Sequence, residues 1–326
     1  MPARLLRTIT ERAAVALRRL RWFAFIRPSD STIDQIKARK EQRSRANLRY
    51  VEAPSCSVIV QSFNQVRNVS VLESRLRATS MQELIVCEDG SLDGSHEAWL
   101  RLLVNPNDFL LHSNDLHEIR TYNRAIGMAQ GAVVCLMQDD DRPPSDGAWL
   151  ADALEIFERY PRLAVLGGWC GFDRYFEVEY NAPWLLSRDT AIPFLDPPTG
   201  RPFAFVENVN IGPYFVRRRV FDELGGFDLR FSGVGEPGIT FESEFCYRVW
   251  RAGHQVALTD IPVKQQTGKL SYILPGGTSM WGSEARTRNE RANKQLIKEL
   301  YDDDLPAIQR AVCESNEALT PALSAS

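Results

Sequence analysis

Three successive carboxylates, Asp139, Asp140 and Asp141, follow the apolar run AVVCLM at 132–137. Adjacent carboxylates at the end of a buried strand repel one another, and a divalent cation with oxygen ligands would neutralise them. Mg²⁺ and Mn²⁺ typically bind one or two carboxylates in proteins and complete their coordination with substrate phosphates. The triplet therefore indicates a metal-bound nucleotide diphosphate, with a solvated acidic turn before Pro143 as the alternative.

Two more polar loops follow apolar runs that are rich in β-branched residues. The run CSVIVQ at 56–61 leads into SFN at 62–64, and the run ELIVC at 83–87 leads into EDGSLDG at 88–94. These side chains could hold a nucleotide through hydrogen bonds to its base and ribose. The second loop is also ordinary turn chemistry, and the two interpretations can hold together.

The elements that must position these loops alternate along the chain. The predicted strands are 56–61, 83–87, 109–112 and 132–137, and the predicted helices between and beside them are 66–79, 95–104 and 122–130. Strands separated by helical segments predict βαβ units, an α/β fold and a mainly parallel sheet. Ligands of such sheets bind at the carboxyl ends of the strands, which is where the polar loops fall.

Five motifs in this order resemble family 2 glycosyltransferases with the GT-A fold, over roughly residues 55–270. They are SVIVQSFN at 57–64, CEDGSLDGS at 87–95, TYNRAIGMAQG at 121–131, LMQDDD at 136–141 and RRRVFDELGGFD at 217–228. The resemblance implies one catalytic domain with a mixed, mostly parallel sheet and flanking helices. The chain departs from the family pattern at Gln61, Glu88 and Gln138, where proline, aspartate and aspartate are usual.

The resemblance also implies an inverting transferase that uses a nucleotide-diphosphate sugar, with a UDP-sugar first among the donors, and a divalent metal ion, Mn²⁺ or Mg²⁺. The metal ligands that it implies are Asp139, Asp140 and Asp141. The nucleotide contacts that it implies are Gln61, Ser62, Phe63, Asn64, Glu88, Asp89, Asn123 and Asp139. The acceptor would be a glycan or glycolipid, in keeping with the synthesis of cell-surface polysaccharides.

The catalytic base is expected in the segment FESEFCYR at 241–248, which resembles the family's EDxELCxR. Glu242 takes the place of the base aspartate, and Phe241 takes the place of the glutamate before it. The backbone must compensate for the extra methylene of Glu242, because a general base acts only within hydrogen-bond reach. Glu244 is the rival base, and both glutamates are also first-turn acids that the helix macrodipole favours.

Aromatic residues with interspersed acids gather at 169–184. Aromatic faces suit stacking on sugar rings, and we assign acceptor binding to Trp169, Tyr175 and Trp184. The alternative is an ordinary core cluster.

The net charge of −3 hides an asymmetry along the chain. Residues 1–50 hold thirteen Lys/Arg against four Asp/Glu, so they carry +9 and the remaining 276 residues carry −12. Within 4–27, apolar side chains recur at helical spacing opposite arginines and end in aromatics, which is typical of an interfacial anchor on an anionic membrane. The alternative is a helix packed on the body or on another subunit of a homo-oligomer. No recognition motif supports a nucleic-acid partner.

Composition and cysteine usage bound the class of protein and its compartment. The 44% hydrophobic and 25% charged residues are close to the globular average, which excludes pervasive disorder, collagen and disulfide scaffolds. Six scattered cysteines form no CxxC pair, which excludes zinc ribbons and indicates a reduced, cytoplasmic chain. With no run of 18 apolar residues, membrane contact is expected to be peripheral, on the inner face and through residues 1–27.

We expect three segments along the chain. They are a basic amphipathic helix and linker at 1–50, a GT-A catalytic domain at 51–275, and a helical extension with a disordered tail at 276–326. The helix of the extension is predicted at 284–300.

Two other functions compete with the transferase. A catalytically inactive glycan-binding or scaffolding relative is suggested by Gln61, Phe241 and the absence of a histidine at 263–267, where the family often has a metal ligand. A sugar nucleotidyltransferase would need a Gly-rich, basic loop after the first strand, and residues 62–65 contain no glycine.

Overall fold

The computed structural model describes residue 34 and residues 55–114, 116–177, 185–187, 192–232, 236–263 and 284–319. The chain divides into two units, Met1–Tyr50 and Val51–Ser326. The expected membrane-binding helix at 4–27 and Trp184 lie outside the described residues. Within the described ranges, no helix combines the length and the apolar character needed to cross a membrane.

Strands and helices alternate through the first half of the second unit. The elements are β1 (Cys56–Ser62), α3 (Val66–Arg77), β2 (Glu83–Glu88), α4 (Ser95–Leu102), β3 (Phe109–His112), α5 (His117–Met128), β4 (Val133–Gln138) and α6 (Ala148–Arg159). Every residue of β1 and β2 is buried. Strands covered on both faces show continuous apolar runs instead of alternation, which is why the sequence pattern revealed them.

Shorter strands dominate the second half, and helices close it. The elements are β5 (Leu163–Gly167), β6 (Cys170–Phe172), η1 (Tyr175–Glu177), β7 (Leu185–Ser187), β8 (Phe203–Phe205), β9 (Asn208–Val209), β10 (Tyr214–Arg217), α7 (Arg218–Glu223), η2 (Leu229–Phe231), α8 (Phe241–Arg251), β11 (Gln255–Thr259), α9 (Glu284–Tyr301) and α10 (Leu305–Glu317). Helix α10 was not predicted from the sequence, although Pro306 in its first turn is a common helix-start signal.

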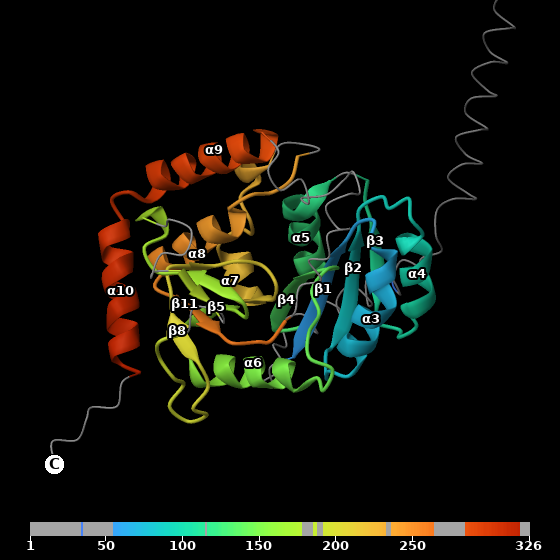
Figure 1. Cartoon of the computed structure of the whole chain (residues 1–326), viewed down its shortest axis with the longest axis horizontal. Coiled ribbons are helices and arrows are strands. Elements are labelled where there is room, and N and C mark those ends of the chain that lie inside the picture. Colours follow the sequence, from blue (N-terminus) through green and yellow to red (C-terminus); the bar gives the residue numbers. More distant parts are fainter. Residues whose placement is uncertain are drawn as a thin grey trace, which may run out of the picture. The chain divides into compact units, whose positions relative to one another are not determined.

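Eight strands form the main sheet, in the order β3-β2-β1-β4-β10-β5-β11-β8. The pairs among β1 to β4 are parallel, β10 runs antiparallel to both of its neighbours, and β11 pairs parallel with β5 and antiparallel with β8. A smaller sheet has the order β7-β6-β9. Helices lie on both sides of the main sheet (Figure 1). The predicted α/β class, with a mixed and mostly parallel sheet and flanking helices, is confirmed.

The register brings the polar loops to one edge of the sheet. Gln61 of β1 lies opposite Cys87 of β2 on one side and opposite Gln138 of β4 on the other. In β2, Glu88 lies opposite His112 of β3. The loops that follow these parallel strands therefore start side by side.

A glycine allows the close approach of two chain segments at the opposite ends of β1 and β4, where these strands begin. A Cβ atom on Gly131 would lie 2.5 Å from the backbone nitrogen of Ser57, so no other residue fits without a shift. Gly131 N donates to Ser57 Oγ at 2.8 Å, and Ser57 Oγ donates to Glu83 Oε1 at 2.6 Å. The final glycine of the motif at 121–131 is thus required by packing.

The last helix, α10, lies along β8 (Figure 1). Asn316 is buried, and its amide makes two hydrogen bonds to the backbone of Phe205 in β8. Phe205 N donates to Asn316 Oδ1 at 2.8 Å, and Asn316 Nδ2 donates to Phe205 O at 2.9 Å. One side chain of α10 thus occupies backbone groups of β8 that face away from the rest of the sheet.

Candidate active site

The loop after β4 carries the three aspartates and is tied to the loop after β1. Asp139 Oδ2 accepts a hydrogen bond from Phe63 N at 2.7 Å, and the Ser62 hydroxyl also hydrogen-bonds to this carboxylate. Asp139 N donates to Gln61 O at 3.0 Å. The structure therefore brings together four of the residues predicted to bind nucleotide or metal.

Burial and mutual repulsion raise the pKa of these aspartates. For Asp139, burial raises the pKa well above its usual range, and the nearby charges of Asp140 and Asp141 raise it further, against the hydrogen bonds from the first loop. Burial also raises the pKa of Asp140. Asp141 is buried, and its Oδ2 accepts from Gln138 N at 2.8 Å. Crowded, desolvated carboxylates of this kind call for a positive charge.

The donor set at this edge fits a hard divalent cation. It offers carboxylate oxygens, and Mg²⁺ and Mn²⁺ prefer oxygen ligands. At the end of β1, Gln61 Oε1 is buried and has no hydrogen-bond partner among the described residues. An unsatisfied buried acceptor costs about 1–3 kcal/mol, so it favours a site that a bound group completes.

Glu88 is also fully buried, but it is surrounded by donors. Its Oε1 accepts from Ser91 N at 2.6 Å, and its Oε2 lies 3.2 Å from His96 Nδ1 and 2.8 Å from His112 Nδ1. Burial alone would raise the pKa of Glu88, but the hydrogen bonds from Ser91, His96 and His112 outweigh it and hold the pKa below its usual value. Glu88 was predicted to contact nucleotide, and its described partners are all protein groups of its own neighbourhood.

Asp89 supports the start of α5. Its Oδ1 accepts from Ser113 Oγ at 2.7 Å and from Leu116 N at 2.9 Å, and its Oδ2 accepts from His117 N at 2.9 Å. Backbone N–H groups in the first turn of a helix need such acceptors. The structure thus uses this predicted nucleotide contact to anchor a helix end, and both roles remain compatible with its position.

Asn64 joins the first two loops in a left-handed backbone conformation, with φ of 53°. Its backbone nitrogen donates to Ser91 Oγ at 2.9 Å, and its side-chain Oδ1 accepts from Leu92 N at 2.8 Å. Ser62 Oγ accepts from the buried Trp99 Nε1 at 2.9 Å. The loop ends therefore form one hydrogen-bonded surface.

Asn123 was also predicted to contact nucleotide, and its amide serves as a clamp between distant segments. Asn123 Nδ2 donates to Phe227 O, and Asn123 Oδ1 accepts from Phe227 N, both at 2.8 Å. A Cβ atom on Gly226 would lie 3.0 Å from Asn123 Oδ1. These contacts join the motifs at 121–131 and 217–228 through both polar atoms of the amide.

The two candidate bases in the first turn of α8 have different surroundings. Glu242 keeps partial exposure, and its Oε2 is buried without a hydrogen-bond partner in the described part of the chain. Burial raises the pKa of Glu242 to about 7, with a further upward contribution from Glu118 and from Glu290, while Arg286 opposes them. The carboxylate is thus poised to exchange a proton near neutral pH.

Glu244 is only 1% exposed, and both of its oxygens are occupied. Arg248 contacts them through Nε at 2.7 Å and through Nη2 at 2.8 Å, and Tyr301 Oη donates to Oε1 at 2.6 Å. Such an arrangement fixes α8 against α9 and leaves no free oxygen for an acceptor hydroxyl.

Phe241 explains one departure from the family pattern. Its ring is buried and packs edge-to-face on Phe227 at 4.8 Å, and Phe227 in turn contacts Phe221 and Phe245. Aromatic pairs of this geometry contribute about 0.5–1.5 kcal/mol each beyond area burial. The buried Phe241 ring therefore fixes the backbone immediately before Glu242.

The aromatic segment contributes a buried tyrosine beside Glu242. Tyr175 is buried, lies in T-shaped contact with Phe172 and Phe176, and is hydrogen-bonded to Ser243. Trp169 is partly exposed. Tyr175 therefore belongs both to an aromatic core cluster and to the surroundings of the candidate base.

The charged residues around Glu242 were not predicted from the sequence. Glu118 of α5 is buried, and burial raises its pKa, while its Oε2 accepts from Gly238 N at 3.1 Å. From α9, Lys294 Nζ lies 4.8 Å from the centre of the Tyr175 ring. No local pattern predicts these contacts, since α5 and α9 reach α8 only through the tertiary fold.

A model of the family described as glycosyl transferase family 2 matches residues 57–225, slightly more than half of the 326 residues. The chain belongs to glycosyl transferase family 2. Family membership, together with the strand order, confirms the GT-A fold expected from the five motifs.

This family 2 chain is similar to the glucosyl-dolichyl phosphate glucuronosyltransferase of Haloferax volcanii, with 26% identity over 210 residues. The match covers 60% of the chain and 63% of that relative, so the chain spans less than two thirds of the relative's length.

Solved structures with a similar chain path include S. aureus TarS 1-349, which is 15% identical with a TM-score of 0.44 over 63% of this chain and 57% of that chain. The complex of the same fragment with UDP-GlcNAc gives 16% identity and a TM-score of 0.43, over 63% and 55% of the two chains. A mycobacterial protein gives 14% identity and a TM-score of 0.44, over 70% and 72%.

Proposed function

We propose that this family 2 chain is an inverting, metal-dependent glycosyltransferase that moves a sugar from a nucleotide-diphosphate sugar to a glycan or glycolipid acceptor. The observation that carries the proposal is the carboxylate of Glu242, which has one buried oxygen without a partner and a pKa raised by burial to about 7. A group that must remove a proton at neutral pH works best with a pKa near that pH.

Glu242 is the base in this mechanism. With a pKa of about 7, roughly half of the molecules carry the deprotonated form at neutral pH. That form accepts the proton of the acceptor hydroxyl as the oxygen attacks the anomeric carbon, and a single displacement inverts the anomeric centre. Glu244 is less suited to this role because Arg248 and Tyr301 occupy its oxygens.

Asp139, Asp140 and Asp141 would hold Mg²⁺ or Mn²⁺. When bound, the ion supplies positive charge that stabilises the leaving diphosphate. Phe63 N and the Ser62 hydroxyl hold the carboxylate of Asp139 in place, so this ligand is oriented before the donor binds. Preorganised groups stabilise developing charge better than groups that must rearrange.

The loops at 62–64 and 88–94 would bind the base and ribose of the donor, for which we propose a UDP-sugar. The hydrogen bonds that join Asn64 to Ser91 and Leu92 support a rigid nucleotide-binding surface. Asp89 anchors the same loop to α5.

For the acceptor, we propose a lipid-linked or polysaccharide sugar of the cell surface. The name of the H. volcanii relative contains a dolichyl phosphate carrier, which supports a glycolipid. Trp169, Tyr175 and Trp184 would contact the acceptor sugar, and residues 1–27 would bring a cytoplasmic enzyme to the inner face of the membrane. The catalytic unit would then be 51–275, with 276–326 as a helical extension.

One assay tests this function. Purified chain is incubated with a panel of nucleotide sugars and Mn²⁺ or Mg²⁺, and slow release of the nucleotide diphosphate is measured with and without chelator. We expect release from one donor that chelator and the double variant Asp139→Ala/Asp141→Ala abolish. The control is Asp302→Ala/Asp303→Ala, which changes two exposed aspartates beyond α9. This variant should release the nucleotide diphosphate from the donor at the normal rate. Release from no donor, or release that chelator leaves unchanged, would refute the proposal.

A further inference from the structure

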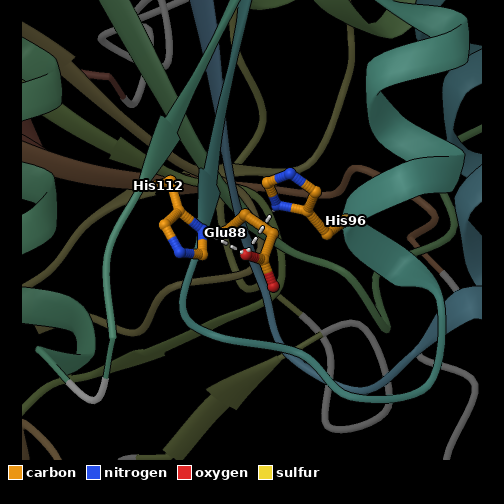
Figure 2. Close-up of side chains that lie close together, drawn as sticks. All are labelled: Glu88, His96 and His112. Carbon is orange, nitrogen blue, oxygen red and sulfur yellow. Dashed lines mark hydrogen bonds and ion pairs between the residues drawn. The ribbon is translucent and has the colours of Figure 1, made fainter.

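Three potential metal ligands from three elements converge beyond the loop after β2. Glu88 ends β2, His96 lies in the first turn of α4, and His112 ends β3. Figure 2 shows the Glu88 carboxylate between the two imidazole rings. Among the described residues, this is the group of histidine, cysteine and acidic side chains whose ligand atoms all lie within 4.8 Å of one another.

Two of the distances in the cluster can be compared with the edges of a small coordination shell. Zinc binds histidine nitrogen and carboxylate oxygen at about 2.0–2.2 Å, so neighbouring ligands of a tetrahedral ion lie about 3.3 Å apart. In the cluster, Glu88 Oε2 lies 3.2 Å from His96 Nδ1 and 2.8 Å from His112 Nδ1. The two rings are nearly perpendicular, with an interplanar angle of 86° and centroids 5.0 Å apart. The Glu88–His96 distance is already close to such an edge, and the Glu88–His112 pair would open by about 0.5 Å to reach it.

The cluster is also open on one side and supported on the other. The side chains of His96 and His112 are 28% and 55% exposed, so an ion can enter from solvent and keep water in a remaining position. Glu88 is fully buried, and Ser91 N holds its second oxygen at 2.6 Å. A ligand carboxylate oriented by a hydrogen bond is typical of protein metal sites.

We propose that Glu88, His96 and His112 form a site for a transition-metal ion, with Zn²⁺ as its best match. Two imidazoles and one carboxylate favour zinc and related ions over Mg²⁺, which prefers oxygen ligands. The chemistry of this site therefore differs from that of the three aspartates after β4.

The ion would join β2, α4 and β3 and fix the loop at 88–94. Glu88 accepts a hydrogen bond from Ser91 N, and the Ser91 hydroxyl accepts one from Asn64 N at 2.9 Å. Glu88 and Ser91 therefore connect the site to the loop after β1. A metal that binds the folded chain and not the unfolded chain raises its stability. We assign the ion a structural role, with no part in the chemical step of transfer.

The test measures zinc binding by the full chain without a polyhistidine tag. Chelator-treated protein is titrated with Zn²⁺ against a chromophoric zinc indicator, in excess Mg²⁺ to occupy oxygen-rich sites. We expect one Zn²⁺ per chain, and a loss of affinity of at least about tenfold in each of His96→Ala and His112→Ala. Circular dichroism verifies that both variants fold, which the partial exposure of the two rings favours.

Two controls separate this site from others. His254→Ala removes a histidine outside the cluster, and Asp139→Asn/Asp141→Asn changes the acidic loop; both should bind Zn²⁺ as the unmodified chain does. Zn²⁺ should also raise the melting temperature of the unmodified chain and not that of His112→Ala. Absence of binding, or unchanged affinity in both histidine variants, would overturn the proposal, as would binding that only the aspartate variant loses.

Discussion

The loop after β2 and the loop after β4 both bury carboxylates at the same edge of the sheet, but they stabilise opposite protonation states. Around Glu88, a backbone N–H and two imidazoles hold the pKa below its usual value, although burial alone would raise it. Around Asp139, burial and two neighbouring aspartates raise the pKa, and the hydrogen bonds from the first loop do not compensate. Burial is common to both, so the difference lies in the surrounding charges and donors.

This difference separates a carboxylate whose ionised form is stabilised by neighbouring side chains and backbone from carboxylates whose ionised form is disfavoured by their surroundings. Glu88 is satisfied by the protein, whereas Asp139 and Asp140 gain if a cation or a proton arrives. Glu242 belongs with the second kind, because burial raises its pKa to about 7. Acids with raised pKa values in a family's motif positions are candidates for function.

Of the changes considered, replacement of Glu242 should have the largest effect, and it should act on the rate of sugar transfer. Glu242→Gln removes the base and keeps the side-chain size, so we expect transfer to fall by about 10²–10⁴-fold while nucleotide binding is retained. Transfer rates and binding of the nucleotide diphosphate by calorimetry check this. The control Glu223→Gln changes an exposed glutamate paired with Arg219 and should transfer normally. Normal transfer by Glu242→Gln would place this acid with Glu88, among the structural carboxylates.

Replacement of Glu88 should lower stability. Glu88→Gln puts an amide where Ser91, His96 and His112 offer donors to a carboxylate, so we expect the free energy of unfolding to fall by about 1–3 kcal/mol at pH 7. Urea denaturation in the presence of chelator measures the change. An unchanged midpoint would mean that the network around Glu88 contributes nothing, and the contrast with Asp139 would disappear.

The pH dependence of transfer should report Glu242. Because the base must be deprotonated, kcat/KM should rise with pH through about 7, and fall about tenfold for each unit below that value. The residual activity of Glu242→Gln should lack this rise. A profile that is flat between pH 5.5 and 8 would assign proton removal to another group.

Replacement of Asp139 should change stability in the direction opposite to Glu88. A raised pKa in the folded state gives stability that is present below the unfolded pKa and is lost as pH rises through the folded pKa. Asp139→Asn removes that loss, so without metal at pH 8 we expect it to be more stable than the unmodified chain. Addition of Mn²⁺ should stabilise the unmodified chain more than the variant. Thermal unfolding in the two conditions distinguishes these outcomes.

Four of the eight strands of the main sheet were predicted from the sequence, because their signals are local, and no ranges were predicted for β5, β8, β10 and β11. The four predicted strands agree with β1 to β4 within one residue at each end, since β1, β2 and β4 are buried apolar runs and β3 is a partly buried one. The predicted helix at 122–130 begins five residues too late, because α5 starts at His117. The backbone N–H groups at the start of α5 donate to Asp89, which belongs to another loop. The residues next to the helix start therefore contain no signal for this cap.

The candidate site was predictable as a set of residues but not as a set of environments. The motifs identified Asp139 and Glu242. The sequence around Glu242 does not predict that Glu118 and residues of α9 influence the pKa of Glu242. Likewise, Glu88 and Asp89 are adjacent in one motif, but one contacts two histidines and the other a helix start. Neighbouring residues on a strand point to opposite faces, so their surroundings depend on the tertiary fold.

The two hydrogen bonds between Asn316 and Phe205 have a consequence for solubility. The backbone of β8 is the last of the main sheet, and unpaired N–H and C=O groups on such a strand can recruit a strand from another molecule. Asn316 mimics a peptide group and occupies one of these donor and acceptor pairs. Helix α10 thereby limits edge-to-edge aggregation. In a variant truncated before α10, the backbone of β8 would be exposed to strands of other copies of the chain.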